Sequence, residues 1–143
     1  ACCKLRGIRV TYKRVKGDSM NKEQALHGFW NSFGVTAYEE TTVPDVKDRT
    51  YPYITYNMAT DSLGNVVSLH ASLWYKSNSW LGVTALKDAI AERITGDRYE
   101  TVKFDGGYIY ITGGTPFAQR IDDEDDTIKR IYINAQAEYL CAY

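Results

Sequence analysis

The stretch PYITYNMATDSLGNVVSLHASLWYKS, residues 52–77, decides the fold of this chain. Its two apolar halves flank a turn-forming segment, 61–65, in which Gly64 favours a positive φ. In the second half, apolar residues alternate with mostly polar ones, and that period of two is typical of a half-buried strand. We therefore expect a long antiparallel hairpin. Its second strand places Val67, Leu69, Ala71, Leu73 and Tyr75 on one face, and Ser68, His70, Ser72 and Trp74 on the other.

Two amphipathic helices are expected, over residues 20–33 and 80–95. In each segment apolar residues recur every three or four positions, which is the spacing of one face of an α-helix. Asn21 and Gln24 form a candidate capping box at the start of the first helix, and Ser79 is a candidate cap of the second. The apolar stripes consist of Leu26, Phe29, Trp30 and Phe33 in the first helix, and Val83, Leu86, Ile90 and Ile94 in the second.

Three further strands are expected in the second half of the chain, at 99–104, 108–112 and 128–142. The Asp-Gly pair at 105–106 is a two-residue hairpin signal that joins the first two of them. The glycines and the proline of segment 113–116 are expected to end the second. The inward face of the last strand is apolar and consists of Ile131, Ile133, Ala135, Ala137 and Tyr139.

Residues 8–15 also alternate and predict an N-terminal strand, whereas 35–44 is expected to be a loop. The predicted order is therefore β-α-β-β-α-β-β-β. This order favours a single α+β domain, with a mostly antiparallel sheet and two helices packed on one face. We divide the chain into a basic N-terminal arm, 1–19, and a domain, 20–143, which is long enough for one hydrophobic core.

The arm differs from the rest of the chain in charge. It holds six basic side chains and one acidic one, a net charge of +5, and because the whole chain carries −1, the remainder carries −6. A basic arm can bind nucleic acid, but a solvated edge or an arm docked on an acidic neighbour is the commoner case. Ile8, Val10 and Tyr12 share one face of the predicted strand, which could therefore pair with a sheet edge of its own or of a neighbouring subunit.

The sequence favours no enzymatic chemistry. It has no GxSxG, Walker-loop or HExxH motif, and no motif near His27 or His70 would make either a catalytic base. We expect no catalytic residue, no metal site and no cofactor. Cys2, Cys3 and Cys141 are an odd number in a chain without an evident secretory signal, which favours free thiols. No apolar run approaches the roughly 18 residues of a membrane span, so no membrane partner is expected.

An unusual acidic run precedes the last strand. Because like charges repel, we expect this run to be a well-solvated loop. A calcium loop is excluded, since it needs alternating ligands and a glycine at its sixth position, where Thr127 stands. In an assembly, a ring of such loops around a pore would repel phosphates and keep DNA from its wall. The run consists of Asp122, Asp123, Glu124, Asp125 and Asp126.

Aromatic side chains are frequent, at 12 Tyr, 3 Trp and 4 Phe. Several fall on the side of their strand that is expected to face solvent. Single exposed aromatics mean little, but a group of them on one sheet face indicates a buried interface. The last strand adds polar residues to the same face. The candidate inter-subunit or tube interface consists of Ile8, Val10, Tyr12, Tyr53, Trp74, Tyr132, Asn134 and Gln136.

Three segments together resemble one protein family. They are MNKEQALHGFWNSFGVTAYEETTVP at 20–44, PYITYNMATDSLGNVVSLHASLWYKSNSW at 52–80 and TPFAQRIDDEDDTIKRIYINAQAEYL at 115–140. In pattern and order they are similar to the small tail terminator proteins, also called tail completion proteins, of long-tailed phages and prophages of Gram-positive hosts. The resemblance begins at Met20. Residues 1–19 are therefore expected to be either an added arm or a segment upstream of the usual translation start at Met20.

The resemblance implies an α+β fold and a hexameric ring at the head-proximal end of the tail tube. Such a ring ends tube polymerisation and joins the tail to the neck, and DNA passes through it without specific binding. The implied partners are other copies of the chain, the tail tube protein and the neck connector or stopper proteins. The implied location is the tail-neck junction of the virion, and the host cytoplasm during assembly. Two alternatives stay open: a connector or stopper of the neck, and a small ligand-binding α+β domain unrelated to phages.

Overall fold

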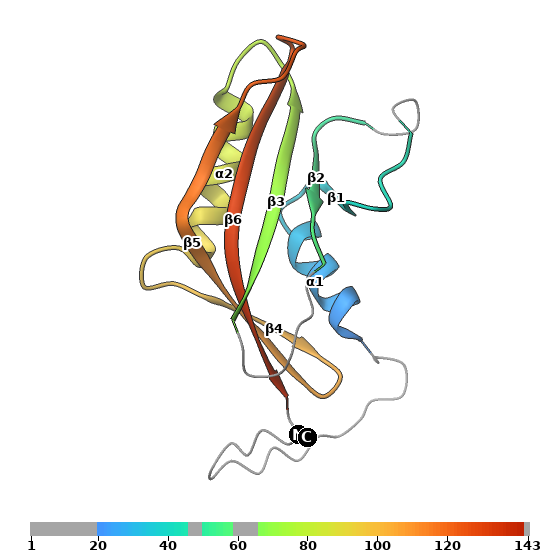
Figure 1. The fold of residues 1–143 in the computed structure, drawn as a ribbon, viewed down its shortest axis with the longest axis vertical. Helices are drawn as coiled ribbons and strands as arrows, with labels where there is room; N and C mark the ends of the chain where they lie inside the picture. Colours follow the sequence, from blue (N-terminus) through green and yellow to red (C-terminus); the bar gives the residue numbers. More distant parts are fainter. Residues whose placement is uncertain (1–19, 46–49, 59–65, 142–143) are drawn as a thin grey trace.

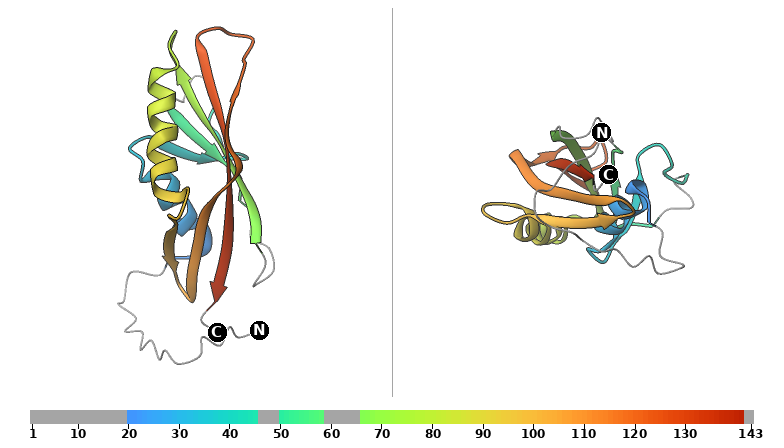
Figure 2. Two further views of the ribbon diagram at one scale, coloured as in Figure 1. Left: turned by 90° about the vertical axis from the view of Figure 1, so that its left-hand side faces the viewer. Right: turned by 90° about the horizontal axis from the view of Figure 1, so that it is seen from below.

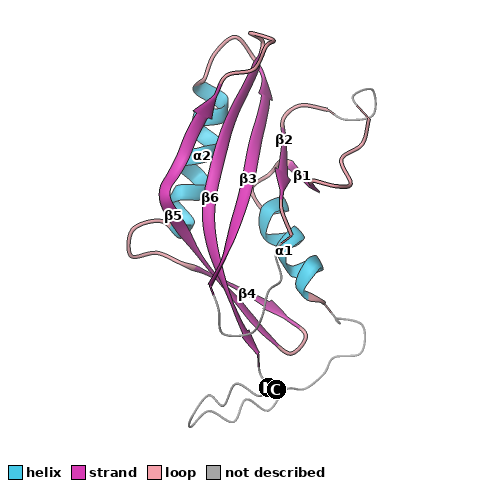
Figure 3. Ribbon diagram, in the orientation of Figure 1, coloured by secondary structure: helices cyan, strands magenta, loops and turns pink. Residues whose placement is uncertain are grey.

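The structure is a computed structural model that describes residues 20–45, 50–58 and 66–141. These ranges contain two helices and six strands (Figures 1 and 3). The strand expected at 8–15 and the turn expected at 61–65 lie outside the described residues. In chain order the elements are α1 (Lys22–Asn31), β1 (Thr36–Glu39), β2 (Tyr53–Tyr56), β3 (Val66–Lys76), α2 (Leu81–Ile94), β4 (Glu100–Phe104), β5 (Gly107–Ile121) and β6 (Ile128–Cys141).

The described strands form one curled sheet in the order β1-β2-β3-β6-β5-β4. Neighbouring strands run antiparallel, except that β1 and β2 are parallel. Helix α1 packs against β1, β2 and β4, and α2 packs against β3, β5 and β6. Both helices lie on the same side of the sheet, as Figure 2 shows. The predicted α+β domain, with a mostly antiparallel sheet and two helices on one face, is confirmed.

The hydrophobic core lies between the two helices and the sheet face that they cover. The apolar stripe of each helix is buried as predicted, except that Phe33 is only partly buried. Trp30 is 0% exposed, and its ring stacks on that of Tyr56 with the ring centroids 6.3 Å apart. The central strands contribute their predicted inward faces, Leu69, Ala71 and Leu73 from β3 and Ile131, Ile133, Ala135, Ala137 and Tyr139 from β6.

The start of α1 uses the residues that the sequence singles out, whereas Ser79, the predicted cap of α2, is not its N-cap. Asn21 Oδ1 accepts a hydrogen bond from the backbone N–H of Gln24 at 2.8 Å, and Gln24 Oε1 accepts one from the N–H of Asn21 at 3.0 Å. This capping box satisfies two donors that a helix start leaves without intrahelical partners. At α2 the N-cap is Trp80, and the Oγ of the preceding Ser79 accepts from the N–H of Leu81 at 3.1 Å. Each helix is slightly shorter than predicted.

The prediction of a loop over 35–44 is wrong at its centre, where β1 forms. This strand has only four residues, which is too short to show an alternating pattern. It is held by parallel pairing with β2, in which Thr36 lies beside Tyr53 and Glu39 beside Tyr56. Such pairing depends on which segments the fold brings together rather than on local propensity.

Strand β5 does not end where the sequence analysis expects, but continues through an irregularity of register between 113 and 118. The two glycines there allow close approach. A Cβ on Gly113 would lie 2.8 Å from Thr95 Cγ2 at the end of α2, and a Cβ on Gly114 would lie 2.8 Å from Asn134 Nδ2. The glycines therefore admit neighbouring atoms instead of breaking the strand, a role that glycine often has inside sheets.

Two buried tyrosines make stability sensitive to alkaline pH. Burial raises the pKa of Tyr139 to about 12. Burial, together with the carboxylates of Glu39 and Glu23, raises the pKa of Tyr56 to about 12. Phenols of an unfolded chain ionise near pH 10, roughly. Because the folded pKa lies above the unfolded one, the stabilising contribution is complete below pH about 10 and is lost as the pH rises through about 12.

We therefore expect the free energy of unfolding to fall between pH about 10 and about 12, and to fall less steeply in a Tyr139→Phe variant. Phenylalanine fills the same space but has no hydroxyl to ionise. Urea unfolding of both proteins across this range measures the two slopes. Equal slopes would contradict the contribution assigned to Tyr139.

Candidate functional site

The sheet face that carries neither α1 nor α2, here called the helix-free face, gathers side chains from three adjacent strands. Successive residues of a strand point to opposite faces, so the residues between the core positions of β2, β3 and β6 lie here. They surround a cleft of about 820 Å³, which the segment after β1 and the β5–β6 loop also border. Side chains around this cleft include Glu40, Thr55, His70, Ser72, Trp74, Arg130 and Tyr132.

The centre of the helix-free face is aromatic. Tyr53 is only 2% exposed, and its ring centroid lies 5.9 Å from that of Trp74, 6.0 Å from that of Tyr38 and 5.1 Å from that of Tyr51. Two predicted interface residues, Tyr53 and Trp74, are thus in contact. Tyr53 is buried within the chain among these three rings, whereas Trp74 is partly exposed. Sequence reasoning missed Tyr38 and Tyr51 because no strand pattern surrounds them.

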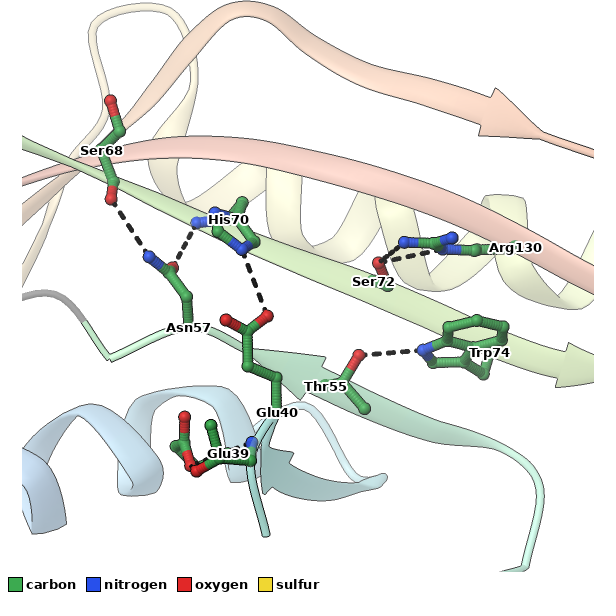
Figure 4. Close-up of polar contacts among 10 residues, drawn as sticks. Glu39, Glu40, Thr55, Asn57, Ser68, His70, Ser72, Trp74 and Arg130 are labelled. Carbon is green, nitrogen blue, oxygen red and sulfur yellow. Dashed lines mark hydrogen bonds and ion pairs between the residues drawn. The ribbon is translucent and has the colours of Figure 1, made fainter. Parts of the chain in front are cut away.

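Arg130 of β6 lies across β3 on the helix-free face (Figure 4). Its Nε and Nη2 donate hydrogen bonds to Ser72 Oγ at 3.1 and 3.0 Å, and its guanidinium carbon lies 4.7 Å from the centre of the Trp74 ring. Trp74 is fixed in turn by a hydrogen bond from its Nε1 to Thr55 Oγ1 at 2.9 Å. In the part of the chain that the structure describes, no carboxylate lies within 4.0 Å of this guanidinium. Sequence reasoning did not single out Arg130.

A second polar group lies further along β3 (Figure 4). The ring of His70 stacks on that of Tyr132 with centroids 5.8 Å apart, and its Nε2 lies 3.3 Å from Glu40 Oε2. The backbone N–H of His70 donates to Asn57 Oδ1 at 2.6 Å, and Asn57 Nδ2 donates to the carbonyl of Ser68 at 3.5 Å. His70 is on the polar side of its strand, as predicted, but its partners could not be predicted from the pattern of its own strand.

The other predicted interface residues follow one another along β6. Tyr132 borders the cleft, Asn134 is half-buried beside Gly114 of β5, and Gln136 is exposed. Their predicted orientation, away from the core, is confirmed, and their role in an interface stays a prediction. Three predicted interface residues lie outside the described part of the chain: Ile8, Val10 and Tyr12.

The acidic run 122–126 forms an exposed loop between β5 and β6, as predicted. Two of its carboxylates shape it. Asp123 Oδ1 accepts a hydrogen bond from the N–H of Asp125 at 3.0 Å, and Asp125 Oδ1 accepts from the hydroxyl and the N–H of Thr127 at 2.7 and 2.9 Å. These Thr127 bonds lower the pKa of the Asp125 carboxyl. Asp123 and Asp125 also border the cleft.

Asp125→Ala is expected to lower the melting temperature more than Glu124→Ala. Both residues are exposed, but only the first substitution removes the side-chain acceptor that closes the loop on Thr127. Thermal unfolding of the two variants at neutral pH compares them. Identical melting temperatures would show that the bonds to Thr127 contribute nothing to stability.

Two further features bear on chemistry. Among the described residues, no three His, Cys, Asp or Glu side chains are grouped as metal ligands would be. His27, expected to be solvated, is exposed, and its Nδ1 lies 3.1 Å from the hydroxyl of Tyr56.

No helix in the described ranges is long and apolar enough to cross a membrane.

Comparison of the sequence with known protein families and with curated proteins found no match. The helix-free face is therefore the candidate site that the structure offers. The face brings together Trp74 and Tyr132, which the sequence predicted, with Arg130, His70 and Glu40, which it did not.

Proposed function

We propose that this protein is a structural virion protein. It forms a ring at the head-proximal end of a phage tail tube, ends tube polymerisation and joins the tail to the neck. The observation that carries the proposal is the helix-free face, a sheet surface with an aromatic centre that neither helix covers. The segments that resemble tail terminator proteins supply the position in the virion.

The chemistry of the helix-free face is that of a protein interface. Tryptophan, tyrosine and arginine are the residue types most enriched at binding hot spots. Trp74, Tyr132 and Arg130 all border one cleft, and carboxylates stand around them. An aromatic centre within a polar rim is the usual anatomy of a surface that binds another polypeptide. This composition supports assembly with other copies, with the tail tube protein or with neck proteins.

In this proposal the acidic loop, 122–126, faces the channel through which DNA passes. The loop joins the long strands β5 and β6 at one tip of the molecule (Figure 1). Its exposed carboxylates repel phosphates, so DNA would move past it without specific binding.

Replacing Asp122, Asp123, Asp125 and Asp126 by asparagine is expected to leave fold and ring intact but to impair DNA passage. Asparagine keeps the Oδ1 acceptors that shape the loop and removes the negative charge. The melting temperature and micrographs of the variant check the fold and the ring, and the infectivity of phage that carries it checks passage. Full infectivity would remove the loop from the mechanism.

Tube polymerisation tests the proposed function itself. The tail tube protein is polymerised with and without this protein, and tube lengths are measured in micrographs. The proposal expects shorter tubes that carry a ring at one end. Tubes of unchanged length, with no ring on either end, would contradict it.

A second candidate function is the binding of a small ligand, which the cleft of about 820 Å³ favours. Ligand pockets commonly have this size and place a few polar groups among aromatic ones. A ligand-binding domain of this kind would stay monomeric or dimeric beside tail tube protein. Its melting temperature would rise with small carboxylic acids that can pair with Arg130.

A further inference from the structure

The Arg130 side chain is ordered and still has N–H groups that can bind an anion. Its guanidinium is fixed on two sides, by Ser72 Oγ and by the face of Trp74. Only Nε and Nη2 take part in hydrogen bonds with described residues, so Nη1 still has donors to offer. A planar guanidinium with free N–H groups matches a carboxylate or a phosphate. Because the side chain is already ordered, little conformational entropy is lost when it binds.

The charges around Arg130 select between these anions. Glu40 borders the cleft beside His70, and Asp123 and Asp125 border it from the β5–β6 loop. A nucleic acid would bring phosphates against these carboxylates, which is repulsive. A polypeptide that carries a carboxylate beside a cation can pair the first with the Arg130 guanidinium and the second with a carboxylate at the border of the cleft. The cleft therefore fits a short, mixed-charge protein segment better than DNA.

The turn between α2 and β4 has this chemistry. Its residues Asp97, Arg98 and Tyr99 are all exposed, and Tyr99 is one of the few large apolar side chains that the surface presents, at 56% exposure. The ring of Tyr99 packs at a tilt against that of Tyr110 with centroids 4.7 Å apart, which limits its freedom. Among described side chains, no cation lies within 4.0 Å of the Asp97 carboxylate.

The turn and the cleft lie on opposite sides of one subunit. The turn lies beside β5 and β4 (Figure 1), whereas the residues that line the cleft come mainly from β2, β3 and β6, toward the other edge of the sheet. Two different, complementary surfaces on opposite sides form a head-to-tail contact, and such contacts close into rings when the rotation between copies allows.

We propose that the α2–β4 turn of one copy docks into the helix-free cleft of the next copy. The Asp97 carboxylate pairs with the guanidinium of Arg130, Arg98 lies near the Glu40 carboxylate, and Tyr99 packs against the aromatic wall of the cleft. This inference rests on the proposed ring and names the surfaces that build it.

Charge reversal on each side of the contact tests the inference. Arg130→Glu and Asp97→Arg each place like charges opposite one another. Each variant alone is therefore expected to need a protein concentration at least about tenfold higher than the wild type to assemble. In an equal mixture, the cleft of an Arg130→Glu copy can bind the turn of an Asp97→Arg copy. The native cleft of the Asp97→Arg copy can bind the native turn of an Arg130→Glu copy, so opposite charges meet at both contacts. The mixture is therefore expected to assemble again. Light scattering over a concentration series measures all three samples.

Two matched controls reverse charge elsewhere. Glu23→Arg changes an exposed carboxylate in the first turn of α1. Arg120→Glu removes a guanidinium that also lies 4.7 Å from a tryptophan ring, that of Trp80, but at a register position opposite the core residue Ile131. Both controls are expected to assemble like the wild type. Circular dichroism checks the fold, and Asp97→Arg keeps the test decisive if Arg130→Glu is unfolded, since Asp97 is exposed.

The outcomes separate this inference from the proposed function. Loss of assembly in each single variant and recovery in the mixture support the docking of turn into cleft. A wild type that forms rings while Asp97→Arg forms them equally well overturns the inference and leaves the proposed function standing. A wild type that stays monomeric, alone and with tail tube protein, overturns both.

Discussion

Trp30→Ala is expected to lower the free energy of unfolding by about 3 to 5 kcal/mol. Trp30 is fully buried between α1 and the sheet, where its ring contacts Tyr56, Phe29 and Phe33. Alanine would leave a cavity that the surrounding rings cannot close. Because a small domain has a total stability of about 5 to 15 kcal/mol, this loss leaves the domain close to unfolding. Urea unfolding measures it.

Trp30→Phe is the matched control and is expected to cost only about 1 to 2 kcal/mol. The Trp30 Nε1 is buried, and no acceptor in the described part of the chain bonds it. Phenylalanine loses part of the ring but also removes this unsatisfied donor. If both variants lost the same stability, the indole N–H rather than the ring volume would be the important group, and this account of the core would be wrong.

Trp74→Ala is expected to weaken the proposed ring assembly roughly thirtyfold while the fold survives. The Trp74 ring supports the Arg130 guanidinium at 4.7 Å and stacks on Tyr53 at 5.9 Å, so its loss removes a wall of the cleft. Tryptophans at the centre of interfaces typically contribute about 2 kcal/mol or more, which is roughly thirtyfold in the dissociation constant. The main core lies on the other face of the sheet and is not touched.

Trp74→Phe separates shape from hydrogen bonding. Phenylalanine keeps an aromatic face for Arg130 but loses the bond from Trp74 Nε1 to Thr55. We expect this variant to assemble with at most about a tenfold weaker dissociation constant. Analytical ultracentrifugation of both variants, with circular dichroism as a check on folding, compares them. Normal assembly of a folded Trp74→Ala variant would show that the helix-free cleft is not part of the ring contact.

Local sequence signals predicted the helices, the central strands and the turn between β4 and β5, but not the continuation of β5 through 113–116. Alternation in β3 and β6 assigned every core position between Val67 and Leu73 and between Ile131 and Tyr139 correctly. The Asp-Gly pair at 105–106 forms the expected hairpin, in which Gly106 has φ of 98°. These features depend on neighbours in the sequence, which is why the sequence alone is sufficient for them.

The candidate site depends on contacts between distant residues, and these were not visible in the sequence. Arg130 lies opposite Trp74 because β3 pairs with β6 in one particular register. Glu40 reaches His70 only because the short strand β1 pairs with β2. Periodicity assigns a residue to a face of its strand, but not the residue that stands beside it on the next strand. The aromatic face was therefore predictable, and the arginine within it was not.

The central claim is that this chain assembles into a ring through its own surfaces. The most direct measurement is the mass of the purified protein by light scattering, alone and with tail tube protein, together with electron micrographs of both samples. The account predicts six-fold rings whose mass is six times the 16.2 kDa of the chain, either free or at one end of short tubes. A particle of 16.2 kDa in both samples, with tubes that grow without limit, would contradict it.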